Sequence, residues 1–288
     1  EDFKKIYEDT EIPETLEFRV RQSIRSIKMK HRITWGKKIG LTTVASLVIF
    51  TGVLNMNQSF AMALSELPII GAVVKVLTFE FDQIQNEHVN ANIEIPIITG
   101  LENDALEKAL NEKYYEESKA LYEAFIAEMG DIMEIGGHLG VDSGYVVMTD
   151  TDEILSIGRY VVNTVASSST TFQYDTIDKK EGLLITLPSL FVDDTYVTRI
   201  SEYLIETMKA QMAEDADKIY WVSEDDFSPF KGISSTQSFY ITDTGKLVIS
   251  FDKYEAAPGY MGVLTFEIPT EVISDLLVNA SGTGYIKP

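Results

Sequence analysis

Residues 237–268, "QSFYITDTGKLVISFDKYEAAPGYMGVLTFEI", predict two paired β-strands and a third strand after a turn. Apolar and polar residues alternate on both sides of Asp243-Thr244-Gly245. The apolar residues that should face one another are Phe239 and Ile241 before the turn, and Leu247, Ile249 and Phe251 after it. Alternation with period two around a turn that contains Gly is typical of a β-hairpin. This part of the chain is therefore expected to form an antiparallel sheet.

Two longer segments, within residues 102–129 and 189–214, carry apolar residues at helical spacing. Their stripes consist of Leu106, Leu110, Tyr114, Leu121, Phe125 and Met129, and of Val197, Ile200, Leu204, Met208 and Met212. The other strand-like stretches are "NANIEIPIIT", "SGYVVMTD", "LSIGRYVVNTVA", "TTFQYDTID" and "GLLITLP", and a short closing helix is expected at 270–278. Two units of a helix followed by strands predict an α+β body of antiparallel sheets, with domains at 85–188 and 189–288.

Charge is distributed unevenly along the 288 residues, whose net charge is −21. Residues 1–38 contain 10 basic and 7 acidic side chains, which leaves 14 basic and 38 acidic ones, a balance of −24, in residues 39–288. Such an acidic body repels nucleic acid and attracts cationic partners. The chain has no cysteine, which excludes disulfide bonds and thiolate metal sites.

No ionisable side chain occurs from Ile39 to Ser65. The run "IGLTTVASLVIFTGVLNM" approaches the roughly 20 residues that cross a hydrocarbon core. Eight Lys or Arg residues and no acidic residue lie between Arg19 and Lys38, on one flank only. The apolar run therefore predicts one transmembrane helix at 39–57 in the cell membrane. The positive-inside rule predicts that residues 1–38 are cytoplasmic and that the later residues are extracytoplasmic.

The cytoplasmic segment, 1–38, is expected to contain a short amphipathic helix that begins near Pro13. Its apolar stripe consists of Leu16, Val20, Ile24 and Ile27. Fewer than forty residues lie on this side, so nothing within the chain covers the stripe. Two alternatives stay open: the helix lies on the anionic inner leaflet, or it docks into a cytoplasmic partner.

Residues 57–68, "NQSFAMALSELP", contain Ala61-Met62-Ala63, the small-x-small pattern that signal peptidase cuts. Small residues are also frequent near helix ends, but the segment before this motif is too long for simple targeting. The following stretch, "IIGAVVKVLTFEF", is too short to span a membrane. It is expected to pack on the outer body or on the membrane surface and to shelter the motif, within a juxtamembrane segment at 58–84.

No pattern in the outer body predicts catalysis or a cofactor. His88 and His138 lack metal-ligand spacing, and Ser143 does not lie in a G-x-S-x-G elbow. Acidic pairs such as Asp193-Asp194 are typical of solvated turns. The sequence therefore predicts a protein that is not an enzyme and has no cofactor or metal.

Two segments of the outer body are suited to binding a partner rather than to catalysis. The serine segment, "ASSSTT" at 166–171, is small and polar and is expected to be a loop between two strands. The tyrosine turn, "YEAAPGYMG" at 254–262, is expected to present Tyr260 and Met261 outward from Pro258-Gly259. A tyrosine on a rigid turn is a favourable interface anchor, and an ordinary turn with a half-buried tyrosine is the alternative.

Several long motifs resemble the RsiV-type anti-sigma factors, which are transmembrane regulators of an extracytoplasmic-function sigma factor. The motifs are "GHLGVDSGYVV", "LSIGRYVVN", "SSSTT", "YDTID", "LLITLPSLF", "KIYWV" and "KLVISFDKYEAAPGYMGV", with "IPETLEFRV" and "LPIIGAVVKVLTFE" nearer the N-terminus. The resemblance runs nearly end to end. It identifies the C-terminal part with the domain named after this family, and the preceding part with a deacetylase-associated companion domain.

The resemblance implies a receptor and inhibitor of c-type lysozyme whose cytoplasmic segment, with the stripe at 16–27, holds the sigma factor. Lysozyme binding leads to cleavage by signal peptidase between Ala63 and Leu64, and then to cleavage by an intramembrane site-2 protease. The implied lysozyme-contacting residues are Ser167, Ser168, Ser169, Thr170, Pro258, Gly259 and Tyr260. Two rival hypotheses are a membrane-tethered peptidoglycan-modifying enzyme and a secreted binding protein whose first 63 residues are discarded.

Overall fold

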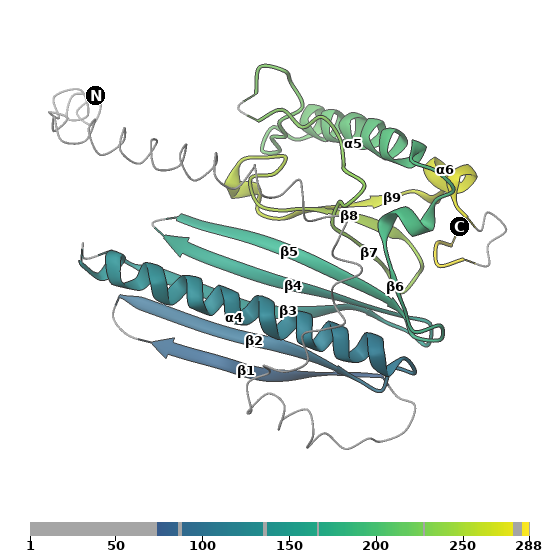
Figure 1. The fold of residues 1–288 in the computed structure, drawn as a ribbon. Helices are drawn as coiled ribbons and strands as arrows, with labels where there is room; N and C mark the ends of the chain where they lie inside the picture. Colours follow the sequence, from purple (N-terminus) through teal and green to yellow (C-terminus); the bar gives the residue numbers. More distant parts are fainter. Residues whose placement is uncertain are drawn as a thin grey trace, which may run out of the picture. The chain divides into compact units, whose positions relative to one another are not determined.

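The computed structural model describes most of the chain after residue 73 (Figure 1). The described residues are 74–85, 88–134, 137–165, 167–226, 228–278 and 284–287. All of them belong to one compact unit, Asn57–Pro288. The predicted cytoplasmic segment, transmembrane helix and cleavage motif lie outside the described residues, with Leu16, Val20, Ile24, Ile27, Ala61, Ala63 and Leu64. Within the described residues, no helix combines the length and the hydropathy needed to cross a membrane.

A six-stranded sheet comes first in the described part of the chain. Its strands, in spatial order, are β1 (Lys75–Gln85), β2 (Val89–Thr99), β3 (Leu139–Asp150), β4 (Ile154–Val165), β5 (Ser167–Asp178) and β6 (Leu183–Ile185). Between β2 and β3 the chain forms the long helix α4 (Asp104–Glu134). The first four predicted strands and the predicted first helix are confirmed, since they coincide with β2, β3, β4, β5 and α4. The fifth predicted strand, at 182–188, is strand only over β6, because its last residues belong to the 3-10 helix η1 (Leu187–Leu190).

β2 and β3 are parallel, whereas the other neighbouring strands described in this sheet are antiparallel. Parallel neighbours need a long crossover, and α4 supplies it while packing against β2. The expectation of purely antiparallel sheets was therefore wrong for this pair, because the alternation of residues does not specify strand direction. Pairing runs only from Val89↔Leu139 to Ile93↔Ser143, so the later parts of the two strands are not paired with each other.

β1 is an edge strand made from the end of the predicted juxtamembrane segment. It pairs with β2 from Lys75↔Thr99 to Gln85↔Asn90, with one bulge between Glu80 and Asp82. The described end of the segment therefore packs on the outer body, which was one of the two expected placements.

A second sheet consists of β7 (Phe239–Ile241), β8 (Leu247–Phe251) and β9 (Leu264–Ile268) in the described residues. The predicted hairpin is confirmed, since Phe239 pairs with Ile249 and Ile241 with Leu247. Gly245 occupies the turn with φ of 76°, a conformation that side chains other than glycine rarely adopt.

Helix α5 (Thr195–Glu214) and the strands of the second sheet share one hydrophobic core. Ile200, Leu204 and Met208 are completely buried in it. The remaining short elements are η1 (Leu187–Leu190), η2 (Gly259–Met261), α6 (Thr270–Ile273) and η3 (Ser274–Leu276). The expected closing helix is thus α6 followed directly by η3, and α5 begins later than predicted because a short turn of helix precedes it.

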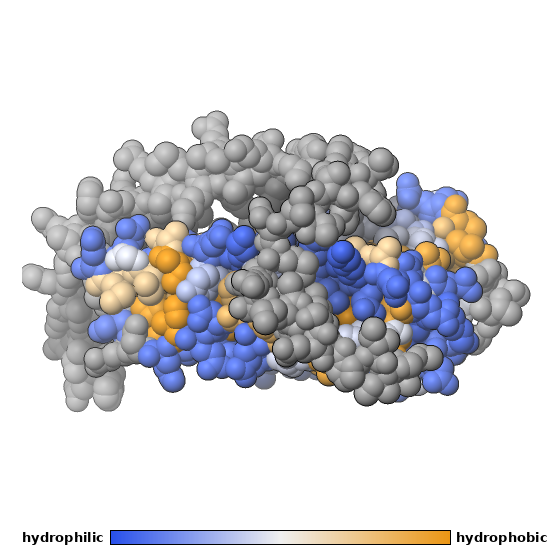
Figure 2. Space-filling view, turned by 60° about the horizontal axis from the view of Figure 1, so that its bottom comes forward, coloured by the Kyte–Doolittle hydropathy of each residue, from blue (hydrophilic) through white to orange (hydrophobic). Residues whose placement is uncertain are grey.

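Buried contacts join the two sheets. The Thr149 hydroxyl donates to the Ile241 carbonyl at 2.6 Å, and the Tyr174 ring stacks on the Tyr240 ring with centroids 5.3 Å apart. On the face drawn in Figure 2, hydrophilic residues separate small groups of hydrophobic ones over the described surface.

Candidate functional site

The serine segment is mostly strand. Ser167 pairs with Val165, and the pairing of β4 with β5 continues in register through Thr171. The expectation of a loop at 166–171 was therefore wrong, because small hydroxyl residues are tolerated in a strand whose partner supplies the pairing. Ser167 is exposed, and Ser168, Ser169 and Thr170 are partly exposed. The segment forms the end of a long hairpin, with its hydroxyl groups accessible.

The tyrosine turn is a compact turn that contains η2. Tyr260 is 65% exposed, and its hydroxyl donates to the Asp217 carbonyl at 3.1 Å. Ala256 and Ala257 are buried and hold the base of the turn on the core. The expectation that Tyr260 points outward is confirmed by this exposure, although its hydroxyl is tied back to the chain. The same expectation was wrong for Met261, which packs against the hydrophobic core. The Tyr260 side chain is thus both accessible and restrained.

The structure brings the two segments together through Lys253, which directly precedes the tyrosine turn. The Lys253 amide donates to the Thr170 carbonyl at 3.1 Å. Its Nζ donates to the carbonyl oxygen of Ser168 at 2.7 Å and to the hydroxyl oxygen of the same residue at 3.0 Å. Lys253 and Ser168 are 85 positions apart in the sequence. One side chain thus connects both predicted contact segments.

Asp252 strengthens this connection from the neighbouring position. Its carboxylate accepts a hydrogen bond from the Phe172 amide at 2.7 Å. Burial raises the pKa of Asp252, while this hydrogen bond acts in the opposite direction. Asp252, which is half-buried, and Lys253 therefore both hold the first residues of β5 against the segment that follows β8.

Tyr254 begins the tyrosine turn with φ of 73°, which is rare for a residue other than glycine. Such a conformation costs on the order of 1–3 kcal/mol and persists only when the surroundings enforce it. Here the Lys253 Nζ lies 5.2 Å from the centroid of the Tyr254 ring. A Cβ at Gly259 would overlap the same ring, so glycine is needed at this close approach. The turn is a strained and well-determined structure.

No metal-binding cluster is found among the described residues. They contain no group of three or more His, Asp or Glu side chains that could hold a metal ion. The rings of His88 and His138 lie 5.1 Å apart, which their distance in sequence did not predict. The paired segments instead offer exposed hydroxyls and the exposed Tyr260, and tyrosine is enriched among interface anchors.

Sequence reasoning found the serine segment and Tyr260 but missed Asp252, Lys253 and Tyr254. The only available signal was the position of Asp252 and Lys253, two charged residues directly after a buried strand. Their contacts with β5 depend on how the two sheets meet, which a linear pattern does not contain.

Comparison with known proteins places the chain in a family. It is 44% identical over 282 residues to the anti-sigma-V factor RsiV of Bacillus subtilis strain 168, covering 98% of this chain and 96% of that protein. The chain belongs to the RsiV-type anti-sigma factors. Membership of this family supports an anti-sigma role for the chain.

The C-terminal part has a further family match. Residues 188–271 match the family described as "Protein of unknown function (DUF3298)". A crystal structure from this family in Bacteroides fragilis is 15% identical, with a TM-score of 0.46 and coverage of 71% of this chain and 93% of that chain. A second, from Pseudomonas aeruginosa, is 12% identical, with a TM-score of 0.47 and coverage of 76% and 99%.

Proposed function

We propose that this RsiV-type chain spans the cell membrane once and is both a receptor and an inhibitor of c-type lysozyme. Its cytoplasmic segment holds an extracytoplasmic-function sigma factor through Leu16, Val20, Ile24 and Ile27. Lysozyme binding outside the membrane allows signal peptidase to cut between Ala63 and Leu64. A site-2 intramembrane protease then completes the release of the sigma factor.

The observation that carries the lysozyme part is the pairing of the serine segment with the tyrosine turn. The resemblance assigns lysozyme contacts to residues 167–170 and 258–260, which are separated by most of the C-terminal region in sequence. Lys253 hydrogen-bonds directly to Ser168 and its backbone pairs with Thr170, so the two sets lie on one surface. A protein partner can contact both sets at once.

The exposure of Tyr260 and the net charge of residues 39–288 also support the proposal. Tyr260 is exposed on a strained turn, which offers large contact area with little loss of conformational freedom on binding. Residues 39–288 carry a balance of −24. Because c-type lysozymes are cationic, this charge accelerates their approach at low ionic strength.

Proteolytic release is supported by the coverage of the similarity. The 98% of this chain that aligns with RsiV takes in most of the segment before the described residues. Binding free energy outside the membrane only has to shift the population in which residues near 61–64 are accessible to the protease.

The experiment uses membranes that hold the full chain and signal peptidase, with and without a c-type lysozyme. We expect a cut after Ala63 only when lysozyme is present, detected by mass spectrometry of the products. Cutting that is equal with and without lysozyme, or absent in both, contradicts the proposed signal.

A variant tests the contact surface. Tyr260→Ala should weaken lysozyme binding by about tenfold or more, because truncation of an interface anchor typically costs about 2 kcal/mol. Leu183→Ala is the matched control, since Leu183 is 55% exposed on β6 and belongs to neither contact segment. Equal affinity of the Tyr260→Ala variant and the control would remove Tyr260 from the site.

A further inference from the structure

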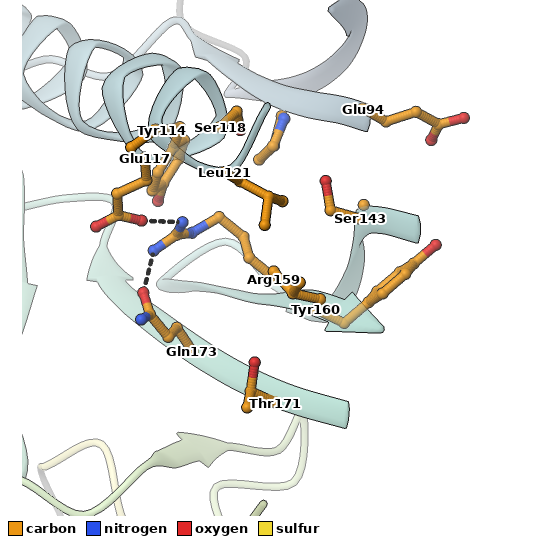
Figure 3. Close-up of a pocket in the computed structure, with 14 residues that line it drawn as sticks. Glu94, Tyr114, Glu117, Ser118, Leu121, Ser143, Arg159, Tyr160, Thr171 and Gln173 are labelled. Atoms are coloured by element: carbon orange, nitrogen blue, oxygen red, sulfur yellow. Dashed lines mark hydrogen bonds and ion pairs between the residues drawn. The ribbon is translucent and has the colours of Figure 1, made fainter. Parts of the chain in front are cut away.

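A cavity of about 410 Å³ lies between α4 and the six-stranded sheet (Figure 3). Helix α4 supplies one wall, with Tyr114, Glu117 and Ser118, and the strands supply Ser143 and Arg159. The cavity lies beside the point where β2 and β3 stop pairing after Ile93↔Ser143, so the strand topology itself makes the space. Its volume is within the range of small-molecule pockets in proteins.

Three polar atoms in the walls of this cavity have no hydrogen-bond partner in the protein. They are the Tyr114 hydroxyl, the Ser143 hydroxyl and the Arg159 Nε. Tyr114 is 0% exposed and Ser143 is 5% exposed. A buried polar group without a partner costs about 1–3 kcal/mol, so three of them around one cavity are unusual. Ser143 shares its face of the sheet with Val161 and Arg159, the face that α4 covers.

The other nitrogen atoms of Arg159 are already occupied. They donate to Glu117, to the Gln173 amide oxygen at 3.1 Å and to Asp175 at 3.3 Å. The guanidinium also lies 4.3 Å from the centroid of the Tyr114 ring. Lys113 binds the other side of Asp175 at 2.9 Å. Its Nε is the one Arg159 nitrogen that has no hydrogen-bond partner in the protein.

Charge in and behind the cavity disfavours an anionic ligand. Arg159 and Lys113 are balanced by Glu117 and Asp175, and Glu94 adds one further negative charge at the wall. An anion would gain no uncompensated positive charge here. The groups without an assigned partner are the Arg159 Nε–H and the hydroxyls of Ser143 and Tyr114, and the Tyr114 hydroxyl also faces the Asp175 carboxylate. They match a ligand that is neutral and carries both carbonyl and hydroxyl oxygen atoms.

We propose that this cavity binds an uncharged, hydroxyl- and amide-bearing small molecule of the N-acetylated sugar class. The acetamido carbonyl accepts from the Arg159 Nε–H, and sugar hydroxyls pair with Ser143 and Tyr114. The proposal does not rest on lysozyme binding, because the cavity shares only Thr171 with the serine segment and nothing with the tyrosine turn.

The test is saturation-transfer NMR with N-acetylglucosamine and the full chain in detergent micelles, without lysozyme. Glucosamine and gluconate, which are cationic and anionic, serve as charge comparisons. We expect transfer to N-acetylglucosamine at millimolar concentration, strongest at its acetyl group. Absence of transfer means that the cavity holds water alone and overturns the proposal. Stronger binding of gluconate overturns the assignment of a neutral ligand.

Two variants locate the bound sugar. Ser143→Ala should weaken binding by about three- to tenfold, because it removes one hydrogen bond to the ligand. The same variant should unfold at an unchanged or higher temperature, since the hydroxyl that it removes has no partner in the protein. Ser118→Trp should fill the cavity and abolish binding.

The matched control is Ser274→Ala, because Ser274 is an exposed serine of η3 outside the cavity. Its affinity for N-acetylglucosamine should equal that of the unmodified chain. Unchanged binding in either Ser143→Ala or Ser118→Trp would place the sugar elsewhere and overturn the proposal, whatever the result of the lysozyme experiments.

Discussion

Helices α4 and α5 each cover a sheet, but their packing differs. The stripe of α5 contains Ile200, Leu204 and Met208, all 0% exposed in a continuous apolar core. α4 has 31 residues against 20 in α5, yet its buried residues are fewer per turn, and Leu121 at the middle of its stripe is only partly buried. Beneath α4 lie an ion-pair network and a cavity. A regular apolar stripe therefore accompanies a filled core, whereas an ion-pair network accompanies the cavity under α4.

The largest effect is expected from removing the positive charge of Arg159 beneath α4. Arg159→Met should lower the free energy of unfolding by about 3–5 kcal/mol, because it leaves the buried Asp175 with only Lys113 as its cationic partner. Urea unfolding of the full chain in detergent micelles measures the change. Lys180→Met is the control, since the Lys180–Glu153 pair is exposed to solvent and contributes little to stability. Equal losses in the two variants would show that burial does not distinguish these pairs.

Leucines at equivalent places on the two helices sharpen the comparison. Leu204→Ala in α5 should cost about 2–5 kcal/mol, because it opens a void in a filled core. Leu121→Ala in α4 should cost about 1 kcal/mol, since Leu121 is partly buried and already borders empty space. The same unfolding measurement applies to both. A loss at Leu121 as large as that at Leu204 would mean that the cavity is closed in solution.

The tyrosine turn belongs to the α5 region, and its expected response is local. Gly259→Ala should force the Tyr254 ring to move and weaken lysozyme binding by about tenfold, while changing the free energy of unfolding by about 1 kcal/mol or less. Gly130→Ala is the control, because nothing lies within 4 Å of a Cβ at this position of α4. It should leave lysozyme affinity unchanged and stabilise α4 slightly. Lysozyme affinity that stays constant in both variants would disconnect the geometry of the turn from binding.

The smallest effect is expected from a contact between the regions. The Tyr285 hydroxyl donates to Asp178 at 2.6 Å, and burial together with this carboxylate raises the pKa of Tyr285 to about 12. Because the folded pKa lies above the ordinary value of 10, the stabilisation is complete below pH 10 and is lost as pH rises toward 12. Unfolding between pH 9 and pH 12 should therefore depend less on pH in Tyr285→Phe than in the unmodified chain. Identical pH dependence would mean that the hydroxyl is not bound to Asp178 in solution.

The predicted fold was most accurate where a local pattern carried the information. Phe239, Ile241, Leu247 and Ile249 predicted both the hairpin and its pairing, because alternation and a Gly turn together determine register. The helical stripe from Ile200 to Met208 likewise predicted the buried face of α5. The direction of β3 relative to β2 was not predictable in this way, since parallel and antiparallel strands can share the same alternation.

In the candidate site, too, residues within a local pattern were predictable and residues joined by long-range contacts were not. Tyr260 was recognisable because Pro258-Gly259 marks a turn and a tyrosine beside it is a typical anchor. Lys253 was not recognisable, because its partner Ser168 is 85 positions away and the contact exists only where the two sheets meet. The polar groups of Tyr114, Ser143 and Arg159 come from α4, β3 and β4, and no sequence spacing relates them.

By itself, the sequence determined most of the helices and strands, with the serine segment as an exception, which of their faces are apolar, and how charge divides between residues 1–38 and the rest. These are properties of neighbouring residues, and short-range periodicity and composition record them. Only the tertiary structure decided that β2 and β3 run parallel, that a cavity lies beside the point where their pairing ends, and that Lys253 ties the serine segment to the tyrosine turn. These features depend on contacts between distant residues, which form when the burial of apolar surface selects one packing of the elements.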